Sequence, residues 1–370
     1  MAAVMNEFDL VGAAPEAAGH PAVIGVQQAL ARIAWEAQSI DVSGVTRAHV
    51  DALAYHGALG VTAPVELGGQ AASAADAREV TELLSGASGA VWFVTTQHRT
   101  PLESALASAP SASYSRWAAP LSSGKALGAV AFAHLRRPGE PSVRATRTAS
   151  GWQVTGTLDW VTSWGLADAL LLMAETDDRR VVQALIPARE REGFVVTGPL
   201  ALAAMGGTAT VGAWLDGMRI DDDEVAAIVD KRDWLARDGE RTANANPAVF
   251  GLMRAVVADL NRLGVERSQP AAVDAARRFA EQVIETRTSA YRLLEEVPAA
   301  EGLDERIGLR ARSLVLLQRI TAARIAAQGG SAMLMLSPAQ RWAREGLFHL
   351  VQAQTQPLRE ALLAEWSMQS

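Results

Sequence analysis

The hydrophobic and polar positions in the first third of the chain follow the period of an α-helix. Val50 and Ala54 lie one turn apart behind Thr46, a residue type common at helix N-caps, and Gly57 ends the pattern. Comparable patterns recur along this part of the sequence. We therefore predict that residues 1–125 form a helical domain.

The period changes to two at about residue 126. Residues 143–149 alternate between apolar and polar side chains, and Ser150-Gly151 turns the chain into a second alternating segment. Further segments with the composition of short strands are 169–176, 180–186, 194–197 and 212–220. This succession of short strands predicts a small antiparallel barrel or sandwich over residues 126–232.

The helical period returns in the last third of the chain. Asn246-Pro247 combines an N-cap residue with proline at the first helical position, and Leu252, Val256 and Leu260 follow along one face. Further helices are predicted to begin near Pro270, Leu303 and Ser337. Long helices joined by short loops form a bundle, so we predict a four-helix bundle within residues 233–370. The fold class that follows is α+β.

Composition narrows the chemistry that the chain can perform. The 370 residues include no cysteine, which excludes disulfides, thiolate metal sites and cysteine nucleophiles. None of the six histidines pairs with another at metal-ligand spacing, so no metal site is expected. The charges are interspersed and sum to −7, which argues against a nucleic-acid surface.

Apolar runs such as Ala169–Ala174 are far shorter than the roughly 20 residues of a membrane span. Met1–Leu10 also lacks the basic start of a secretory signal. We therefore expect a soluble, cytoplasmic protein without a membrane partner.

Three segments resemble the acyl-CoA dehydrogenase family. Gly60–Gly69 is similar to its N-terminal proline- and glycine-containing connector, and Ala327–Gly330 is similar to its Gln-x-x-Gly-Gly turn. Thr155–Thr176, which reads TGTLDWVTSWGLADALLLMAET, is similar to its central hairpin. The order of helices, β-domain and helical bundle is also that of the family. The resemblance implies FAD as cofactor, an acyl-CoA or related substrate, and a homo- or hetero-oligomer, either a dimer or a tetramer.

Two segments are expected to face the flavin. Trp160 and Thr162 lie two positions apart on a predicted strand, so we expect both side chains on one face. In the family the matching Trp and Thr flank the flavin ring; the alternative is that Trp160 only packs the barrel. The resemblance also makes Ala129–Gly139 a flavin-facing strand, with Phe132 and Leu135 against the ring.

Other residues are candidates for binding charged groups. Arg136 and Arg137 could attract a phosphate or carboxylate of the substrate, although a solvated charge run at a strand end is the alternative. By resemblance, Gln328, Gly329 and Gly330 would contact the flavin cofactor.

The catalytic base of the family is a glutamate that removes the α-proton of an acyl thioester. At the usual position this chain has Ala353, which cannot accept a proton. Some branches of the family carry the glutamate in a Glu-Arg pair ahead of a Gly-Leu-Met-like segment. Glu240 precedes Gly251–Met253 in this way and is therefore the candidate base. Asp238 shares the same charged segment, 232–241, which we expect to be a loop.

A second departure concerns the phosphates of the flavin. The family uses an arginine and a Phe-Gly pair between the first two bundle helices, whereas this chain has Arg262 and Arg267 without the Phe-Gly pair.

Three hypotheses remain open. The first is an FAD-dependent oxidoreductase that performs α,β-dehydrogenation of an acyl thioester. The second is a flavin-dependent monooxygenase on the same fold, which needs no α-proton base. The third is a non-catalytic subunit of a heteromeric acyl-CoA dehydrogenase, because site residues can be shared across a subunit interface. The fold alone does not choose among them.

Overall fold

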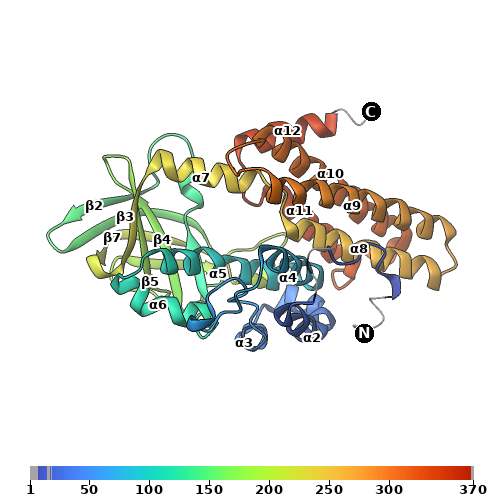
Figure 1. Cartoon of the computed structure of the whole chain (residues 1–370), viewed down its shortest axis with the longest axis horizontal. Helices are drawn as coiled ribbons and strands as arrows, with labels where there is room; N and C mark the ends of the chain where they lie inside the picture. The colour runs from blue at the N-terminus through green and yellow to red at the C-terminus, as the bar shows by residue number, and fades with distance from the viewer. Residues whose placement is uncertain (1–6, 15–16, 18, 368–370) are drawn as a thin grey trace.

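The computed structural model describes residues 7–14, 17 and 19–367. Helices at both ends of the chain flank a central sheet, which confirms the predicted α+β class (Figure 1). No helix within these described residues is both long enough and apolar enough to cross a membrane.

The N-terminal part consists of helices and short connectors. Helix α3 (Arg47–Tyr55) follows Thr46 as predicted, and a capping box formed by Ser73 and Asp76 begins α4 (Ala74–Ala87). The other helices of this part are α2 (Pro21–Ser43), α5 (Gly89–Ala107) and α6 (Ala112–Ser122).

The central part is one eight-stranded sheet. Its strands are β1 (Gly128–Ala131), β2 (Val143–Thr148), β3 (Gly151–Val161), β4 (Ala169–Glu175), β5 (Arg180–Pro187), β6 (Phe194–Pro199), β7 (Val211–Asp221) and β8 (Val225–Asp230). They pair in the order β6-β7-β3-β2-β4-β5-β8, and β1 pairs with β4. The sheet is not purely antiparallel as predicted. Strand β1 runs parallel to β4, because the β2–β3 hairpin separates the two strands in the sequence and supplies the crossover.

Strand β4 is buried along its whole length. Leu170 and Leu172 face the core inside the curved sheet, whereas Leu171 and Met173 face a second core that includes residues of α5 and α6. Burial on both faces explains the unbroken apolar run in this strand.

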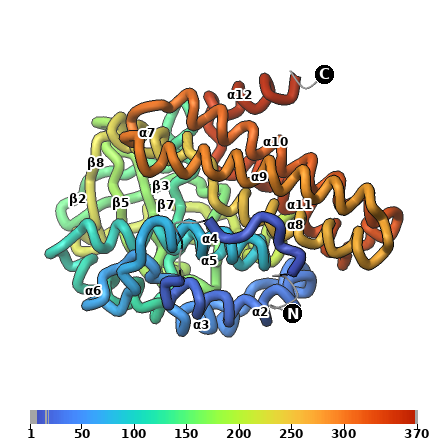
Figure 2. Tube along the Cα trace, turned by 45° about the vertical axis from the view of Figure 1, so that its right-hand side comes forward, coloured from blue at the N-terminus to red at the C-terminus, as the bar shows by residue number. Residues whose placement is uncertain are grey.

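The C-terminal part begins with α7 (Lys231–Ala243), which extends from the sheet to the bundle (Figures 1 and 2). The segment predicted as a charged loop is therefore a helix. Asp230 caps it by accepting a hydrogen bond from the backbone amide of Arg232 at 2.7 Å, and Trp234 buries one face.

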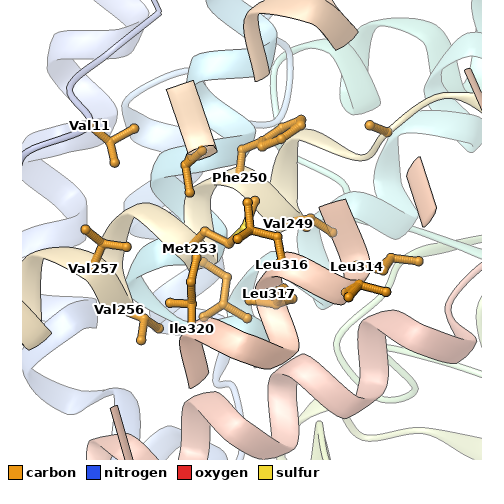
Figure 3. Close-up of a cluster of buried hydrophobic side chains, with 14 of the residues drawn as sticks. Val11, Val249, Phe250, Met253, Val256, Val257, Leu314, Leu316, Leu317 and Ile320 are labelled. Carbon is orange, nitrogen blue, oxygen red and sulfur yellow. The ribbon is translucent and has the colours of Figure 1, made fainter. Parts of the chain in front are cut away.

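The bundle comprises α8 (Pro247–Glu266), α9 (Pro270–Glu296), α10 (Leu303–Gln328), α11 (Pro338–Val351) and α12 (Gln356–Ser367). Side chains of α8, including Phe250 and Met253, pack with Leu317 and Ile320 of α10 in its core (Figure 3).

Helices α4 and α8 cross at two glycines. A Cβ atom on Gly251 would lie 2.0 Å from the backbone oxygen of Glu82, and one on Gly86 would lie 2.9 Å from that of Gly251. At this crossing the buried carboxylate of Glu82 accepts hydrogen bonds from Arg287 at 3.0 Å and from the hydroxyl of Tyr291 at 2.6 Å. The close approach thus places an ion pair between the N-terminal helices and the bundle.

Three histidines are buried. Nε2 of His98 lies 3.1 Å from the backbone oxygen of Leu121, and that of His134 lies 3.0 Å from the oxygen of Met173. The ring centre of His349 lies 4.9 Å from that of Trp92, with the two rings tilted by 34°. Burial lowers the pKa of His98 and of His134 to about 4, and that of His349 to about 3.

We expect Gly251→Ala to lower the free energy of unfolding by about 2 kcal/mol, because the new methyl group meets the backbone of α4. Gly239→Ala is the matched control, since its methyl group would meet no atom within 4 Å. The control should leave the stability unchanged or raise it by up to about 1 kcal/mol. Urea denaturation of both variants measures the difference, and equal midpoints would contradict the close crossing.

We also expect stability to fall as the pH drops from 6.5 towards 4. In that range the unfolded chain takes up protons that the three buried imidazoles of the folded chain do not. Each contributes a slope of about 1.4 kcal/mol per pH unit. His349→Gln removes one contribution, so denaturation at several pH values should give a shallower slope. An unchanged slope would show that His349 is not a buried neutral group.

Candidate functional site

The short helix η2 (Ala133–Arg136) replaces the second half of the expected flavin-facing strand, because β1 ends at Ala131. Leu135 is buried in the core between the sheet and the helices, and its backbone oxygen accepts a hydrogen bond from Nζ of Lys231 at 2.8 Å. Arg137 forms an ion pair with Asp159 near the end of β3. The structure thus brings η2 and the end of β3 together, with the side chain of Leu135 directed into the core.

Trp160 is half exposed on the outer face of the sheet. A register shift between Leu158 and Val161 keeps those two side chains in the core and leaves Trp160 outside it. Trp214 is 55% exposed on the neighbouring strand β7 and pairs with Val195 of β6, which is 54% exposed. We call Trp160, Trp214 and Val195 the aromatic face.

Sequence reasoning did not single out Trp214. The alternation along β7 does contain the signal, because Trp214 occupies an outward position between buried Ala213 and Leu215.

Thr162 does not share the face of Trp160, because β3 ends at Val161 and Thr162 lies buried in the following turn. Its hydroxyl lies 3.0 Å from that of Thr210, which lies 2.8 Å from that of Thr208. Thr208 donates to the backbone oxygen of Met205 at 2.7 Å. Because the proton of Thr208 goes to Met205, Thr210 must donate to Thr208 and Thr162 must donate to Thr210. The hydroxyl proton of Thr162 is therefore used inside the protein.

A bidentate ion pair joins η2 to α7. Nε and Nη2 of Arg136 donate to the two carboxylate oxygens of Asp238 at 2.6 and 2.8 Å. Arg241 approaches the same carboxylate at 3.4 Å. Burial opposes ionisation of Asp238, but the two guanidinium groups outweigh it and lower the pKa of Asp238.

A cavity of about 280 Å³ lies beside this ion pair, between α5, α7 and the sheet. Its lining residues are Thr100, Glu103, Ser104, Met173, Gln183, Val229, Trp234, Arg237, Asp238 and Arg241. The ring of Phe132 stands edge-on to that of Trp234, with 5.7 Å between the ring centres. The guanidinium group of Arg136 lies 5.3 Å from the centre of the Phe132 ring. Phe132 therefore supports the charged groups of η2 and α7.

Ala353 adopts a left-handed conformation, φ +48°, between α11 and α12. Its backbone oxygen and that of Gln352 accept hydrogen bonds from Nη2 of Arg310 at 3.4 and 2.8 Å, and Nη1 of Arg310 donates to the oxygen of Thr242. Burial and the nearby charge of Arg136 lower the pKa of Arg310 to about 10. Ala353, at the position that resembles the catalytic glutamate of the acyl-CoA dehydrogenase family, thus lies against the buried guanidinium group of Arg310.

Glu240 lies on α7 rather than in a loop. Two residues rotate a helix by about 200°, so Glu240 projects from the face opposite to that of Asp238. Its carboxylate has no hydrogen-bond or ion-pair partner in the part of the chain that the structure describes. Glu240 and the pair Arg136–Asp238 are therefore not brought together.

Gln328, Gly329 and Gly330 lie at the end of α10. The backbone oxygen of Gln328 accepts a hydrogen bond from Arg267 at 3.2 Å, and Cβ atoms on either glycine would meet nothing within 4 Å. Arg262 is paired with Asp259 and Glu266, whereas Arg267 has no ion pair within residues 19–367.

These residues are remote from the aromatic face within one chain. The first turn of α10 contacts the junction of α7 and α8, where Arg306 donates to Asn244 at 2.6 Å. From Arg306, α10 runs through a further 22 residues, or about 33 Å, to Gln328. Figure 1 shows the long helices extending away from the sheet. The predicted cofactor residues thus form two separate groups.

The described residues contain no group of three or more His, Asp or Glu side chains that could hold a metal ion.

Comparisons with known proteins address the fold. No protein-family model matches the sequence, and no curated protein matches it. Solved structures do match. The chain is similar to butyryl-CoA dehydrogenase from Megasphaera elsdenii, with a TM-score of 0.76 and 15% identity over 98% of each chain.

Two other solved structures are comparably similar. Glutaryl-CoA dehydrogenase from Mycobacterium smegmatis, in complex with FADH2, gives a TM-score of 0.76 and 15% identity over 94% of this chain and 93% of that one. Dibenzothiophene monooxygenase from Paenibacillus sp. A11-2 gives a TM-score of 0.75 and 17% identity over 95% and 97%. The predicted resemblance is confirmed at the level of the fold: this chain has the fold of the acyl-CoA dehydrogenases.

Proposed function

We propose that the protein is a flavin-dependent oxidoreductase that binds FAD in a site shared by two copies of the chain. The aromatic face is the observation that carries this proposal. Trp160 and Trp214 expose large indole surfaces on the outer face of the sheet, and flat amphipathic rings suit contact with an isoalloxazine ring. The solved glutaryl-CoA dehydrogenase with FADH2 has the same fold, which supports the assignment.

The donor set at the aromatic face fits FAD in part. Trp160 would contact the ring, and backbone amides of η2 need no particular side chain to contribute. Phe132, predicted to contact the ring, packs against Trp234 of α7 instead. The hydroxyl of Thr162 would not donate to it, because its proton is used within the chain of threonines. When bound, FAD would supply a two-electron acceptor.

The group at the end of α10 fits a phosphate. Gly329 and Gly330 leave their backbone open to close approach, and Arg267 offers a cation without a carboxylate partner among the described residues. Because this group is remote from the aromatic face of its own chain, a second copy would have to supply it. The proposal therefore includes a dimer or a tetramer.

The reaction we propose first is α,β-dehydrogenation of an acyl thioester. It requires a carboxylate to accept the α-proton. Glu240 is the candidate, because its carboxylate is not committed to an ion pair, whereas Asp238 is held by Arg136 and Arg241.

One observation favours the two alternatives, a monooxygenase or a non-catalytic subunit, over the acyl thioester dehydrogenase. Arg310 lies against Ala353, where the family base would be, and a buried cation cannot accept a proton. This arrangement suits a flavin-dependent monooxygenase, for which the dibenzothiophene monooxygenase of the same fold is a precedent. It equally suits a non-catalytic subunit that completes a site on a related chain.

We expect the purified chain to bind FAD and to show the visible absorption bands of a flavoprotein. Trp160→Ala and Arg267→Gln, one from each group, should each weaken FAD binding about tenfold or more. Trp35→Ala is the control, because Trp35 is 72% exposed on α2 and belongs to neither group. Equilibrium titration with FAD measures all three.

A chain that stays colourless and binds no added FAD would overturn the stand-alone oxidoreductase. The non-catalytic subunit would then be the better hypothesis.

We expect Glu240→Gln to lower the oxidation of butyryl-CoA, followed by reduction of an electron-accepting dye, about a hundredfold or more. Asp233→Asn is the matched control, because Asp233 is exposed on the same face of α7 two turns earlier. Loss of activity in Asp238→Asn but not in Glu240→Gln would transfer the role of base to Asp238. Turnover that depends on oxygen and supplied reduced flavin, with no thioester oxidation, would favour the monooxygenase.

A further inference from the structure

Strands β2 and β4 part from each other near one end of the sheet. They pair at a single position, Arg144 with Glu175. Beyond it β2 continues through Ala145–Thr148, which pair with β3 on one side and with no strand that the structure describes on the other. Figure 1 shows β2 at the end of the molecule away from the bundle. A short strand edge is therefore left open between two neighbours in the sheet.

The pairing of β2 with β3 identifies which backbone groups lie on this edge. The amide of Thr157 in β3 donates to the oxygen of Ser142 at 3.1 Å, just before β2 begins. Hydrogen-bonded residues alternate along an antiparallel pair, so the even-numbered residues of β2 bond to β3. The backbone oxygen of Ala145 and both backbone groups of Arg147 therefore point away from β3, beyond the single pair with β4.

A cavity of about 590 Å³ lies along this edge. Ala145 and Arg147 of β2 line one side of it, and Thr176–Asp178 of the β4–β5 turn line another. Trp152 of β3 and Ile228 of β8 contribute apolar surface. The open backbone groups of β2 are thus next to a hollow that is large enough for a side chain as well as a strand.

Trp152 also offers a buried hydrogen-bond donor. Only 5% of this residue is exposed, and its indole nitrogen has no hydrogen-bond partner within the part of the chain that the structure describes. Buried polar atoms are seldom left without a partner, because the lost hydration is costly. The carbonyl oxygen of a bound peptide group is a suitable acceptor for this donor.

The carboxylates at the cavity outnumber the guanidinium groups, three to two. The charged lining residues are Arg147, Arg180, Asp177, Asp178 and Asp222. Arg147 pairs with Asp222, and Arg180 pairs with Asp178 at 2.7 Å. Asp177 makes one ion contact, at 3.5 Å, and 87% of its side chain is exposed. A partner with basic side chains would complement this excess.

Pairing of the same edge in two copies of the chain is less favourable. Such a pair would bring Arg144 and Arg147 of one β2 next to the arginines of the other, and like charges on facing strands destabilise the pairing. The charges at this edge therefore favour a basic segment of another protein over a second copy.

We propose that the gap beside β2 binds an extended peptide segment of another protein as an added strand. The backbone of the peptide would bond to the free groups of Ala145 and Arg147. Successive side chains of a strand point to opposite faces, so apolar residues facing Trp152 and Ile228 would alternate with basic ones. The open edge of four residues spans about 13 Å, which makes the bound segment short. This inference does not depend on the proposed function, because binding requires no flavin.

Fluorescence anisotropy of a labelled hexapeptide of alternating lysine and valine tests the proposal on the full chain without added flavin. We expect saturable binding at low ionic strength. Replacing the central valine of the peptide by proline should weaken binding about tenfold or more, because proline removes a backbone donor and disfavours the strand. A hexapeptide of alternating glutamate and valine should bind more weakly than the lysine peptide, because the carboxylates of the cavity repel it.

Two variants at one position separate the strand edge from its side chain. Arg147→Pro removes the backbone amide that faces the gap, whereas Arg147→Ala keeps it. We expect Arg147→Pro to bind the lysine peptide about tenfold more weakly than Arg147→Ala does. Arg147→Ala should bind it at least as tightly as the wild type, since a positive charge is removed. Thermal unfolding shows whether each variant is folded.

Equal affinities of the two Arg147 variants would overturn the proposal, as would the absence of peptide binding. Equal binding of the lysine peptide and its proline or glutamate counterpart would also overturn it, because strand pairing and charge would then play no part. Self-association of the chain that Arg147→Pro abolishes, without peptide binding, would assign the edge to a second copy instead.

Discussion

Attachment of α7 to the sheet is the constraint on which the candidate site depends. Lys231 anchors the first turn through a 2.9 Å ion pair with Glu175 and a 2.8 Å hydrogen bond to the backbone of Leu135. Two turns later, both carboxylate oxygens of Asp238 accept hydrogen bonds from the guanidinium group of Arg136. A helix with so few buried apolar residues gains little from hydrophobic burial, so these charged contacts fix its position. They thereby create the cavity and set the charge beside it.

The second constraint is the crossing of α4 and α8. Gly86 and Gly251 let the two backbones approach, and the carboxylate of Glu82 then reaches Arg287 and Tyr291 of α9. A buried ion pair adds little net stability compared with apolar packing, but removing one partner leaves the other charge unpaired. The crossing therefore favours one arrangement of the N-terminal helices on the bundle.

The sequence predicted the architecture because periodicity reports which faces are buried, and periods of 3.6 and two differ clearly. It also singled out Trp160 through the resembling hairpin, and the structure leaves this side chain half exposed. It misplaced Thr162 because a bulge near the end of β3 is not visible in the alternation. It took α7 for a loop because most of its residues are charged, and their partners Arg136 and Glu175 lie far away in the sequence. Pairings of that kind require the folded chain.

The charge pattern bears on the chemistry that the site favours. A base that removes a proton must be a carboxylate with a pKa near the working pH, yet the pKa of Asp238 is lowered and Ala353 lies against Arg310. The guanidinium groups of Arg136 and Arg241 instead favour the charged form of Asp238. The cluster is therefore poorly suited to proton removal by Asp238. Any proton acceptor must come from elsewhere, and on α7 the carboxylates without a partner in the described chain lie on the faces turned away from the cavity.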